Sequence, residues 1–498
     1  MLTSQRSSSR SPLAFLAVWT LFLAMPGRVP AQVRAPSPEE KAKIDQAVLR
    51  GVAYLKAVQT PQGVWLPAME GGEPFLVGRT SLAALTLLEC GVPPQDASIQ
   101  KALAFIKQNW ANVQKTYDLS VAILFLDRLG ARRDKQLAQL VQVFALRLIA
   151  GQTMYGGWSY DCPPLAGNVA QAFFATLQNL EKNPAATRIP PAFADYTVMK
   201  NLQQLMTLKN EGETGTTDNS NTQFAIMALW VAQNYAIPLK RTLYLAGYRF
   251  RKTQNKNGSW SYEYIPGDFG SETMTCAGLL GLAISYGITQ QKAPQKDQQI
   301  LRALEYLGKN LEKPSPDGGV PTQDHAQVNY YLLWSVERVG VLFELATIGG
   351  KDWYAWGVKQ LLANQGDKGQ WINGQYPGAD PIVNTCFALL FLKQVNLVAD
   401  LTEKLPLNIK RVDVDIKAND PPPNGTPSAR DGGTIKDAGA INESPVLPPA
   451  SQTTSSSPTP AAKTGFQLDW SDKRVMGIGA GLAGLLILGI LAMTLKRR

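Results

Sequence analysis

Residues 50–65 read RGVAYLKAVQTPQGVW, and the last seven, from Gln59 through Gly63 to Trp65, are the first copy of a repeated pattern. A glutamine precedes a tryptophan by six residues, and a glycine precedes that tryptophan by two. Three further copies pair Gln152 with Trp158, Gln254 with Trp260 and Gln365 with Trp371. The copies begin 93, 102 and 111 residues apart. Each interval is about twice a helix-pair repeat of roughly forty residues, which predicts a degenerate unit between each two marked ones.

Two kinds of helical segment alternate between residues 35 and 400. The first kind carries basic residues beside one apolar face, which predicts half-exposed helices, at residues 39–58, 98–110, 134–150, 194–208, 239–253, 298–311 and 353–364. The second kind is apolar on nearly every side, as buried helices are, at residues 81–88, 119–129, 170–180, 222–232, 274–284, 328–336 and 385–392. This alternation predicts an all-α fold, an (α/α) toroid in which six or seven pairs of outer and inner helices form a closed double ring.

The repeated residues suit a clasp between neighbouring outer helices. The glutamine amide can cap the carbonyls at a helix end and still bond the next repeat. The glycine permits a left-handed turn, and the tryptophan returns a large apolar ring over the helix end with its indole N–H free for a carbonyl. We expect this structural role, with ligand binding by the tryptophans as the alternative, for Gln59, Trp65, Gln152, Trp158, Gln254, Trp260, Gln365 and Trp371.

The two ends of the chain predict export and a membrane anchor. Residues 1–31 combine early arginines, an apolar stretch and a small-residue site, which is typical of a secretory signal peptide; an uncleaved signal anchor is the alternative. Residues 475–495 are an uncharged run long enough to cross a bilayer as one transmembrane helix. The basic tail, residues 496–498, then lies in the cytoplasm, and the body, residues 35–400, lies on the extracytoplasmic (periplasmic or extracellular) side. Residues 404–470, rich in Pro, Ser and Thr, predict a disordered linker.

The anchor also offers a pairing face. Gly477 and Gly481 form a GxxxG pattern within the apolar run, and such small residues let two membrane helices approach closely. A homodimer through these glycines is one interpretation, and glycine-rich filler in a single-span anchor is the other.

Composition excludes several classes of function. The net charge is +10, but the basic residues are scattered without a run of five or more, so we predict no nucleic-acid partner. The four cysteines lie far apart in the sequence, which excludes metal knuckles of the CxxC type. His325 is the single histidine, which excludes multi-histidine metal sites. The sequence therefore predicts no metal and no cofactor.

The repeated pattern resembles the QW repeat of the squalene-hopene and oxidosqualene cyclases, whose relatives include the protein prenyltransferase β subunits. The fullest match leads from Arg50 and Gly51 through Leu55 to Gln59 and Trp65. The resemblance covers residues 40–395, and it implies an (α/α) toroid with a central cavity. It is specific for the fold and the repeat, and it says less about activity.

The catalytic residues of these families are incompletely matched. The cyclases protonate an alkene with an aspartic acid in an Asp-x-Asp-Asp-Thr stretch, and residues 218–222 are the best counterpart. Asp218 matches, but Ser220 and Asn221 stand where further carboxylates belong, and neither side chain can supply a strong acid. The prenyltransferase zinc site has its counterpart at residues 384–387, where Asn384 replaces the ligand histidine, so zinc is not expected. The resemblance therefore implies a divergent member without the acid motif.

Polar and aromatic residues near the starts of the inner helices are candidates for a ligand-binding rim. If all inner helices run in the same direction, these starts gather at one mouth of the ring. Helix capping is the alternative role for each Asp and Asn. The rim candidates are Arg79, Asp118, Asn168, Asn219, Asn221, Glu272, Asn329, Tyr331, Trp334 and Asn384. The catalytic candidates are Asp218, Asp324, His325 and Tyr330, since a tyrosine–histidine pair could abstract a proton.

Two functional hypotheses follow. In the first, the protein is an exported, membrane-tethered toroid that acts as a non-catalytic binding or scaffold module for a hydrophobic, isoprenoid or glycan ligand or for an envelope protein. In the second, it is an enzyme with cyclase-like (isomerase) or polysaccharide lyase-like chemistry based on rim residues.

Overall fold

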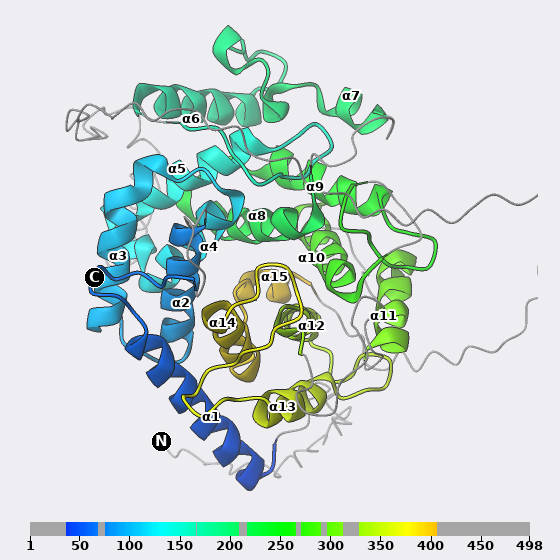
Figure 1. Cartoon of the computed structure of the whole chain (residues 1–498). Coiled ribbons are helices and arrows are strands. Elements are labelled where there is room, and N and C mark those ends of the chain that lie inside the picture. Colours follow the sequence, from blue (N-terminus) through cyan, green and yellow to red (C-terminus); the bar gives the residue numbers. More distant parts are fainter. Residues whose placement is uncertain are drawn as a thin grey trace, which may run out of the picture.

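Six inner helices form a closed ring in the computed structural model, which describes residues 36–67, 75–165, 167–208, 217–264, 270–289, 296–311 and 328–405. Each inner helix packs on the next, and the last packs on the first (Figure 1). In ring order they are α2 (Leu76–Glu89), α4 (Thr116–Leu129), α8 (Asn219–Ala232), α10 (Glu272–Thr289), α12 (Tyr330–Leu342) and α14 (Pro381–Leu392). The predicted all-α fold and its closure are confirmed for the described residues.

Six outer helices surround this ring. They are α1 (Pro38–Ala57), α3 (Ala97–Asn109), α5 (Lys135–Gly151), α9 (Lys240–Lys252), α11 (Gln298–Asn310) and α13 (Trp353–Ala363). Short 3-10 turns occur at η1 (Trp110–Asn112), η2 (Ala131–Arg133), η3 (Pro191–Phe193), η4 (Thr197–Met199) and η5 (Gln233–Tyr235). The described chain thus forms six helix pairs, the lower of the two numbers that the sequence predicted.

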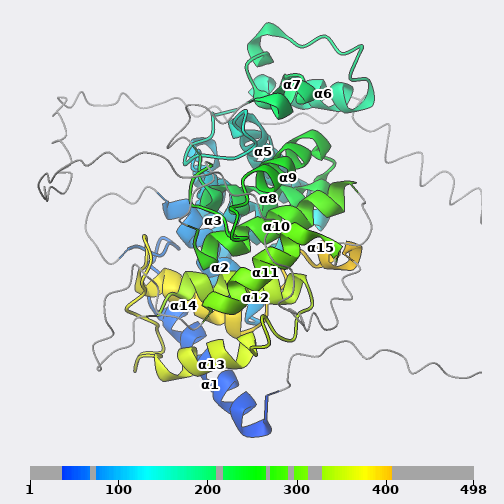
Figure 2. The ribbon, with the colours of Figure 1, turned by 90° about the vertical axis from the view of Figure 1, so that its right-hand side faces the viewer.

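The segment from α6 (Gly167–Lys182) to α7 (Leu202–Thr207) lies outside the double ring, beyond α5 and α9 (Figure 2). The prediction of an inner helix at 170–180 is therefore wrong. Its buried residues, among them Phe173 and Leu177, follow one face at helical spacing, whereas Val169 on another face is 45% exposed. The prediction of one outer helix at 194–208 is also wrong, because η4 and the six-residue α7 divide that stretch.

The four Gln–Trp turns join neighbouring outer helices. Each glutamine Nε2 donates to the carbonyl of its own turn glycine and to a carbonyl of the next outer helix: Ser98, Thr242, Gln299 and Ala47, at 2.8–2.9 Å. Each tryptophan Nε1 donates to the carbonyl ten residues earlier, at Leu55, Leu148, Phe250 and Leu361. The bond to the next outer helix and the indole bond are those that the clasp interpretation predicted, but the glutamine amide binds its turn glycine and does not cap its own helix end. Because Gln365 reaches Ala47 in α1, the last turn closes the ring on its first helix.

The turn glycines serve two purposes at once. Their φ angles are +86° at Gly63, +79° at Gly156, +92° at Gly258 and +89° at Gly369, a region that favours glycine. A Cβ atom at each position would also lie within 2.3–2.7 Å of backbone atoms of the next outer helix. A side chain at these positions is therefore excluded by conformation and by space.

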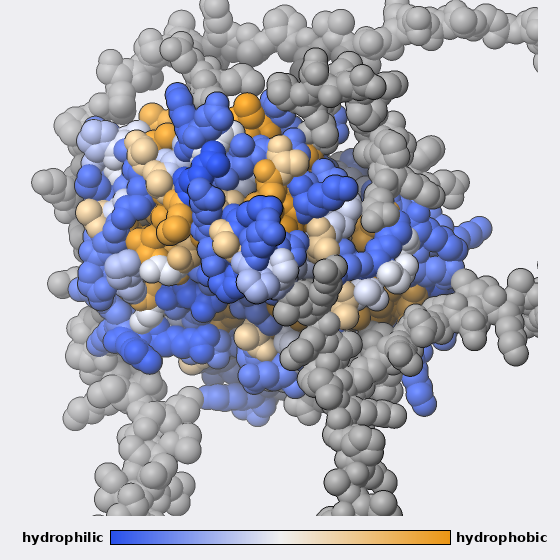
Figure 3. Space-filling model, turned by 90° about the horizontal axis from the view of Figure 1, so that it is seen from below, coloured by the Kyte–Doolittle hydropathy of each residue, from blue (hydrophilic) through white to orange (hydrophobic). Residues whose placement is uncertain are grey.

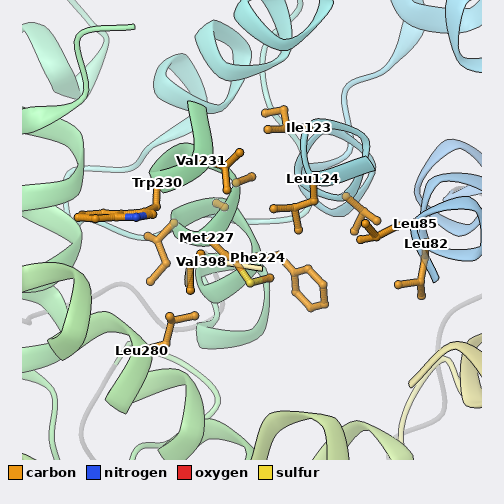
Figure 4. Close-up of a cluster of buried hydrophobic side chains, with 14 of the residues drawn as sticks. Leu82, Leu85, Ile123, Leu124, Phe224, Met227, Trp230, Val231, Leu280 and Val398 are labelled. Atoms are coloured by element: carbon orange, nitrogen blue, oxygen red, sulfur yellow. The ribbon is translucent and has the colours of Figure 1, made fainter. Parts of the chain in front are cut away.

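One end of the ring is covered by the chain that follows α14. This cover consists of residues 395–398 and α15 (Ala399–Lys404), which packs on α10 and α12 (Figure 2). The Asp400 carboxylate accepts a hydrogen bond from Trp230 Nε1 at 3.1 Å. Figure 4 shows Val398 among side chains that converge from α2, α4, α8 and α10. Apolar packing therefore fills this end of the ring.

One face of the toroid is mainly hydrophilic (Figure 3). Seen from below, where α1 and α13 lie, apolar side chains form small separate groups between polar ones (Figure 3). In the described part of the chain, no helix is both long enough and apolar enough to span a bilayer. Four of the predicted segments lie outside the described residues: the signal (1–31), the transmembrane helix (475–495), the tail (496–498) and, beyond residue 405, the linker (404–470).

Candidate functional site

The starts of the inner helices meet at the end of the ring opposite α15, which we call the mouth. Gly78 N of α2 donates to Asp118 Oδ1 of α4 at 2.9 Å, so these two helix starts are joined. The guanidinium of Arg79 forms an ion pair with Asp380, which caps α14. Tyr117 OH of α4 donates to Ser220 Oγ of α8 at 2.7 Å. These contacts bring the starts of α2, α4, α8 and α14 together at one mouth, which is the arrangement that the rim hypothesis requires.

A hydrogen-bonded chain of side chains, which we call the polar thread, crosses the ring from this mouth. Ser220 Oγ is 2.7 Å from Tyr331 OH of α12, which also accepts from Gln223 Nε2. Gln223 Oε1 in turn accepts from Arg338 Nη2 at 2.8 Å. Tyr117 and Tyr331 are half-buried, while Gln223 is fully buried. The thread therefore runs from side chains that solvent can reach to a buried cation.

Aromatic rings surround the polar thread. The Trp334 and Phe387 rings stack with centroids 4.7 Å apart and planes 14° apart. Phe224 meets Tyr117 edge-on at 5.2 Å. We call this group the central aromatic cluster, and its members are Tyr117, Phe224, Tyr331, Trp334, Tyr376 and Phe387. The cluster gives the ring centre flat apolar faces with tyrosine hydroxyls at their edges.

Asp218 is a helix cap in this structure. Its Oδ1 accepts from Asn221 N at 2.6 Å, and its Oδ2 accepts from Asn221 Nδ2 at 2.8 Å. Burial raises the pKa of Asp218 above its ordinary value, although the bonds from Asn221 act in the opposite direction. A raised pKa keeps the carboxyl group protonated but makes it a weaker acid, whereas alkene protonation needs a strongly acidic group.

The other residues of the 218–222 stretch are also tied to the protein. Asn219 Oδ1 accepts from Arg249 Nε at 3.1 Å, and its amide donates to the Ser261 carbonyl. Thr222 Oγ1 accepts from Trp158 N at 3.1 Å, which connects a Gln–Trp turn to the start of α8. Ser220 is the member of this stretch that bonds to the polar thread. The stretch therefore presents a hydroxyl group, not a carboxyl group, to the ring centre.

The remaining candidates divide into four groups. Asn329 caps α12 through Leu332 N, and Tyr330 OH donates to the Ile372 carbonyl, so both support local structure. Asn384 accepts from Tyr376 OH beside the central aromatic cluster, and Glu272 lies in the first turn of α10. Asn168 lies on α6 outside the double ring, so its prediction as a rim residue is wrong. Asp324 and His325 lie outside the described residues.

Sequence reasoning missed the buried charges of α12. Glu337 is fully buried, Arg338 is 9% exposed, and the predicted inner helix ended before both at residue 336. Two adjacent charged residues inside an apolar helix were the available signal, because buried charges are rare unless they have a role. Gln223, which connects Arg338 to the mouth, carried no such signal.

We predict that Glu337→Gln stabilises the protein above about pH 5. Neither carboxyl oxygen of Glu337 has a hydrogen-bond partner among the described residues, and burial raises its pKa well above the ordinary value. The folded state then holds a proton that the unfolded state loses near pH 4.5. Stability therefore falls as pH rises from that value toward the folded pKa. The variant should gain about 1–3 kcal/mol at pH 7.

Urea unfolding at pH 4.5, 5.5, 6.5 and 7.5 measures this gain. The difference between Glu337→Gln and the parent should grow with pH by up to about 1.4 kcal/mol per unit. The exposed Glu263→Gln is the matched control, and a surface substitution of this kind should change stability by no more than about 0.5 kcal/mol. A flat difference for Glu337→Gln would show that this carboxyl group titrates alike in both states.

Thiol and metal chemistry have little support in the described part of the structure. The four cysteines are free, and burial raises the pKa of Cys162, Cys276 and Cys386 to about 12, which leaves them as inert thiols. No group of three or more His, Cys, Asp or Glu side chains comes together as a metal site within the described residues.

The closed double ring defines an α/α toroid. No protein-family model and no curated protein matches the sequence. The fold is similar to that of the GH76A alpha-1,6-mannanase from Salegentibacter sp. HEL1_6, at 10% identity and a TM-score of 0.43 over 72% of this chain and 99% of that one. It is also similar to the type II terpene cyclase MstE from Scytonema, at 14% identity and a TM-score of 0.40 over 74% of this chain and 99% of that one. These likenesses concern the fold alone.

Proposed function

We propose that the toroid is a binding module that holds a ligand at its mouth without transforming it. The observation that carries this proposal is the position of Ser220. In the stretch that resembles the cyclase acid motif, this serine reaches the ring centre, while Asp218 is a weakened acid held in a helix cap. A hydroxyl group can orient a ligand by hydrogen bonding, but it cannot protonate an alkene.

A neutral, sugar-like ligand suits the mouth best. The hydroxyl groups of Tyr160 and Tyr262 are 3.0 Å apart, and the two side chains are 43% and 46% exposed. Tyr160 also packs edge-on against Tyr117 of the central aromatic cluster. Exposed tyrosines present apolar faces together with hydroxyl donors, and a pyranose ring offers the complementary apolar faces and hydroxyl groups. An isoprenoid would contact the apolar faces but would form no hydrogen bonds with the hydroxyl groups.

Location is the second part of this proposal. Export through residues 1–31 and a tether through residues 404–470 to a transmembrane helix at 475–495 would place the toroid outside the cytoplasm, where envelope glycans occur. A random-coil tether of that length reaches on the order of 45 Å on average. A toroid on such a tether would sample the space near the membrane. This freedom suits capture of a ligand better than fixed contact with one partner.

We predict that Tyr117→Ala weakens binding of a neutral oligosaccharide about tenfold, because the variant removes an aromatic face and the first hydroxyl group of the polar thread. Calorimetric titration of the full chain with neutral, acidic and amino-sugar oligosaccharides, and with squalene, provides the measurement. Tyr354→Ala is the matched control, since Tyr354 packs between α13 and α14 and bonds the Leu392 carbonyl, so ligand affinity should change less than twofold.

Catalysis is tested in the same samples by product analysis. We expect no turnover of any bound ligand. Asp218→Asn is informative because asparagine also caps helices, so the fold should survive. If the parent converts a ligand and Asp218→Asn does not, the protein is an enzyme and the binding-module proposal is wrong. If squalene binds tightly and no oligosaccharide binds, the protein is still a binding module, but its ligand is an isoprenoid and not a sugar.

A further inference from the structure

Asparagine followed by glycine is a chemically reactive pair, and the sequence contains it at residues 257–258, 373–374 and 424–425. The backbone nitrogen of the glycine can attack the asparagine amide, because glycine has no side chain to hinder the approach. The third pair lies outside the described residues. The first pair lies within a Gln–Trp turn and the second directly follows one, so the surroundings of these two pairs can be compared.

The pair at residues 373–374 has both reacting groups free. Asn373 is exposed, and its side-chain amide forms no hydrogen bond with a described residue. The Gly374 N–H also has no acceptor among the described residues, whereas the next N–H, that of Gln375, donates to the Val328 carbonyl at 3.2 Å. In the described part of the chain, no hydrogen bond therefore has to break before the Gly374 nitrogen approaches the Asn373 amide carbon.

The pair at residues 257–258 is held by hydrogen bonds. Asn257 Oδ1 accepts from Ser259 N at 3.0 Å and from Ser259 Oγ at 2.7 Å. The Gly258 N–H donates to the Asn255 carbonyl at 3.0 Å. Asn257 is exposed, as Asn373 is, so access of water does not distinguish the two pairs. They differ in the hydrogen bonds that fix the reacting atoms.

The backbone after the last Gln–Trp turn favours both members of the free pair. Asn373 has φ +62°, a left-handed conformation that asparagine adopts more readily than most residues. A Cβ at Gly374 would lie 2.4 Å from Asn384 Oδ1 and 2.9 Å from Ala379 Cβ, so a larger residue does not fit there. Local conformation and packing therefore place a reactive pair beside the start of α14.

We propose that Asn373 is a site of spontaneous deamidation, and that its isoaspartyl product loosens the end of the turn that closes the ring. The Gly374 nitrogen loses its proton to solvent and forms a bond to Cγ of Asn373. The bond from Cγ to Nδ2 breaks, and the nitrogen takes up a proton and leaves as ammonia. Water then opens the resulting succinimide ring. Addition of water at Cγ yields aspartate, and addition at the main-chain carbonyl carbon of residue 373 yields isoaspartate.

The isoaspartyl product lengthens the main chain, because its side-chain methylene group becomes part of the link from Ile372 to Gly374. On one side of this point the Ile372 carbonyl accepts from Tyr330 OH at 3.0 Å. On the other side Gln375 N donates to the Val328 carbonyl at 3.2 Å. Both bonds attach the turn to the start of α12, and a longer main chain between them distorts at least one of the two. This effect concerns the framework of the ring and does not depend on a ligand at the mouth.

Incubation of the purified full chain in nonionic detergent and heavy-oxygen water tests the site. Deamidation during the incubation incorporates heavy oxygen, and peptide mass spectrometry locates it. The same incubation in urea gives the rate of each pair without the folded structure, so that the effect of neighbouring residue types cancels. We expect folding to slow Asn257 about tenfold more than Asn373, because three hydrogen bonds must break before Gly258 attacks. Both rates should rise with pH, since the attacking nitrogen must lose its proton.

Asn373→Gly is the matched variant. Glycine adopts φ +62° without steric cost and has no side-chain amide, so this variant should fold and should not deamidate at residue 373. Hydrogen exchange of residues 371–376 should become faster as the parent ages and stay constant in the variant. Equal slowing of the two pairs by folding, or greater slowing at Asn373, would overturn the site. Unchanged exchange in a parent that has accumulated isoaspartate would overturn its effect on the turn.

Discussion

Trp371→Ala should lower the free energy of unfolding by about 3–5 kcal/mol, the usual cost of removing a fully buried large aromatic side chain. The side chain has no exposed surface, and its Nε1 donates to the Leu361 carbonyl of α13 at 2.9 Å. Its backbone N–H donates to Thr385 Oγ1 of α14. A Cβ on Gly51 of α1 would lie 3.1 Å from the indole ring, so this ring also touches the first helix. One substitution therefore loosens three helices where the ring closes.

Equilibrium unfolding in guanidinium chloride measures this loss. Trp356→Ala is the matched control, because Trp356 lies on α13, the helix to which the Trp371 indole N–H donates, but is only half-buried, and about 1–2 kcal/mol is expected. Trp371→Phe retains an aromatic ring and removes the N–H, so it should fall between the two. Equal losses for Trp371→Ala and Trp356→Ala would show that closure does not depend on the clasp.

Gly369→Ala should destabilise the protein by about 2–5 kcal/mol for a different reason. The left-handed conformation at φ +89° costs an L-residue about 1–2 kcal/mol. The added Cβ would lie 2.3 Å from the Arg50 carbonyl oxygen, and relieving this overlap costs about 1–3 kcal/mol more. The overlap pushes α1 away from the last Gln–Trp turn, where Arg50 Nη2 donates to the Gly366 carbonyl at 2.6 Å.

Gly378→Ala separates these two contributions. Gly378 has φ +83°, and a Cβ there would meet nothing within 4 Å, so only the conformational cost of about 1–2 kcal/mol remains. The two alanine variants are compared by the same chemical denaturation. A Gly369→Ala loss no larger than that of Gly378→Ala would mean that the turn can move away from α1 without cost.

Local sequence patterns predicted most of the ring, because each Gln–Trp turn carries its own conformational and packing requirements. Gln59 and Gln152 show this, since each makes the predicted amide bond to the next outer helix, while its second bond goes to the turn glycine and not to the helix end. The failure at α6 has an equally local cause. Phe173, Leu177 and Leu180 form one apolar face, and the sequence does not state whether that face meets the ring centre or the outside of α5.

The candidate site was less predictable than the fold. Asp218 and Tyr331 were found because they begin inner helices, but the roles of the two differ: Asp218 caps α8, and Tyr331 belongs to the polar thread. Arg338 lies two turns into α12, and its Nε and Nη1 have no acceptor among the described residues. A missing partner is a property of the assembled ring, so no spacing along the chain could reveal it.

The contact between α1 and the last Gln–Trp turn, which closes the ring, sets the order of folding events. Gln365 and Ala47, which bond there, are 318 residues apart. At synthesis rates of roughly 5–20 residues per second, α1 waits roughly 15–60 s before its partners on α13 and α14 exist. During this interval Ile44, Val48 and Leu55, buried in the finished ring, lack those partners. Contacts between such distant segments form slowly, so a holdase that covers this face should raise the yield of closed rings during biosynthesis.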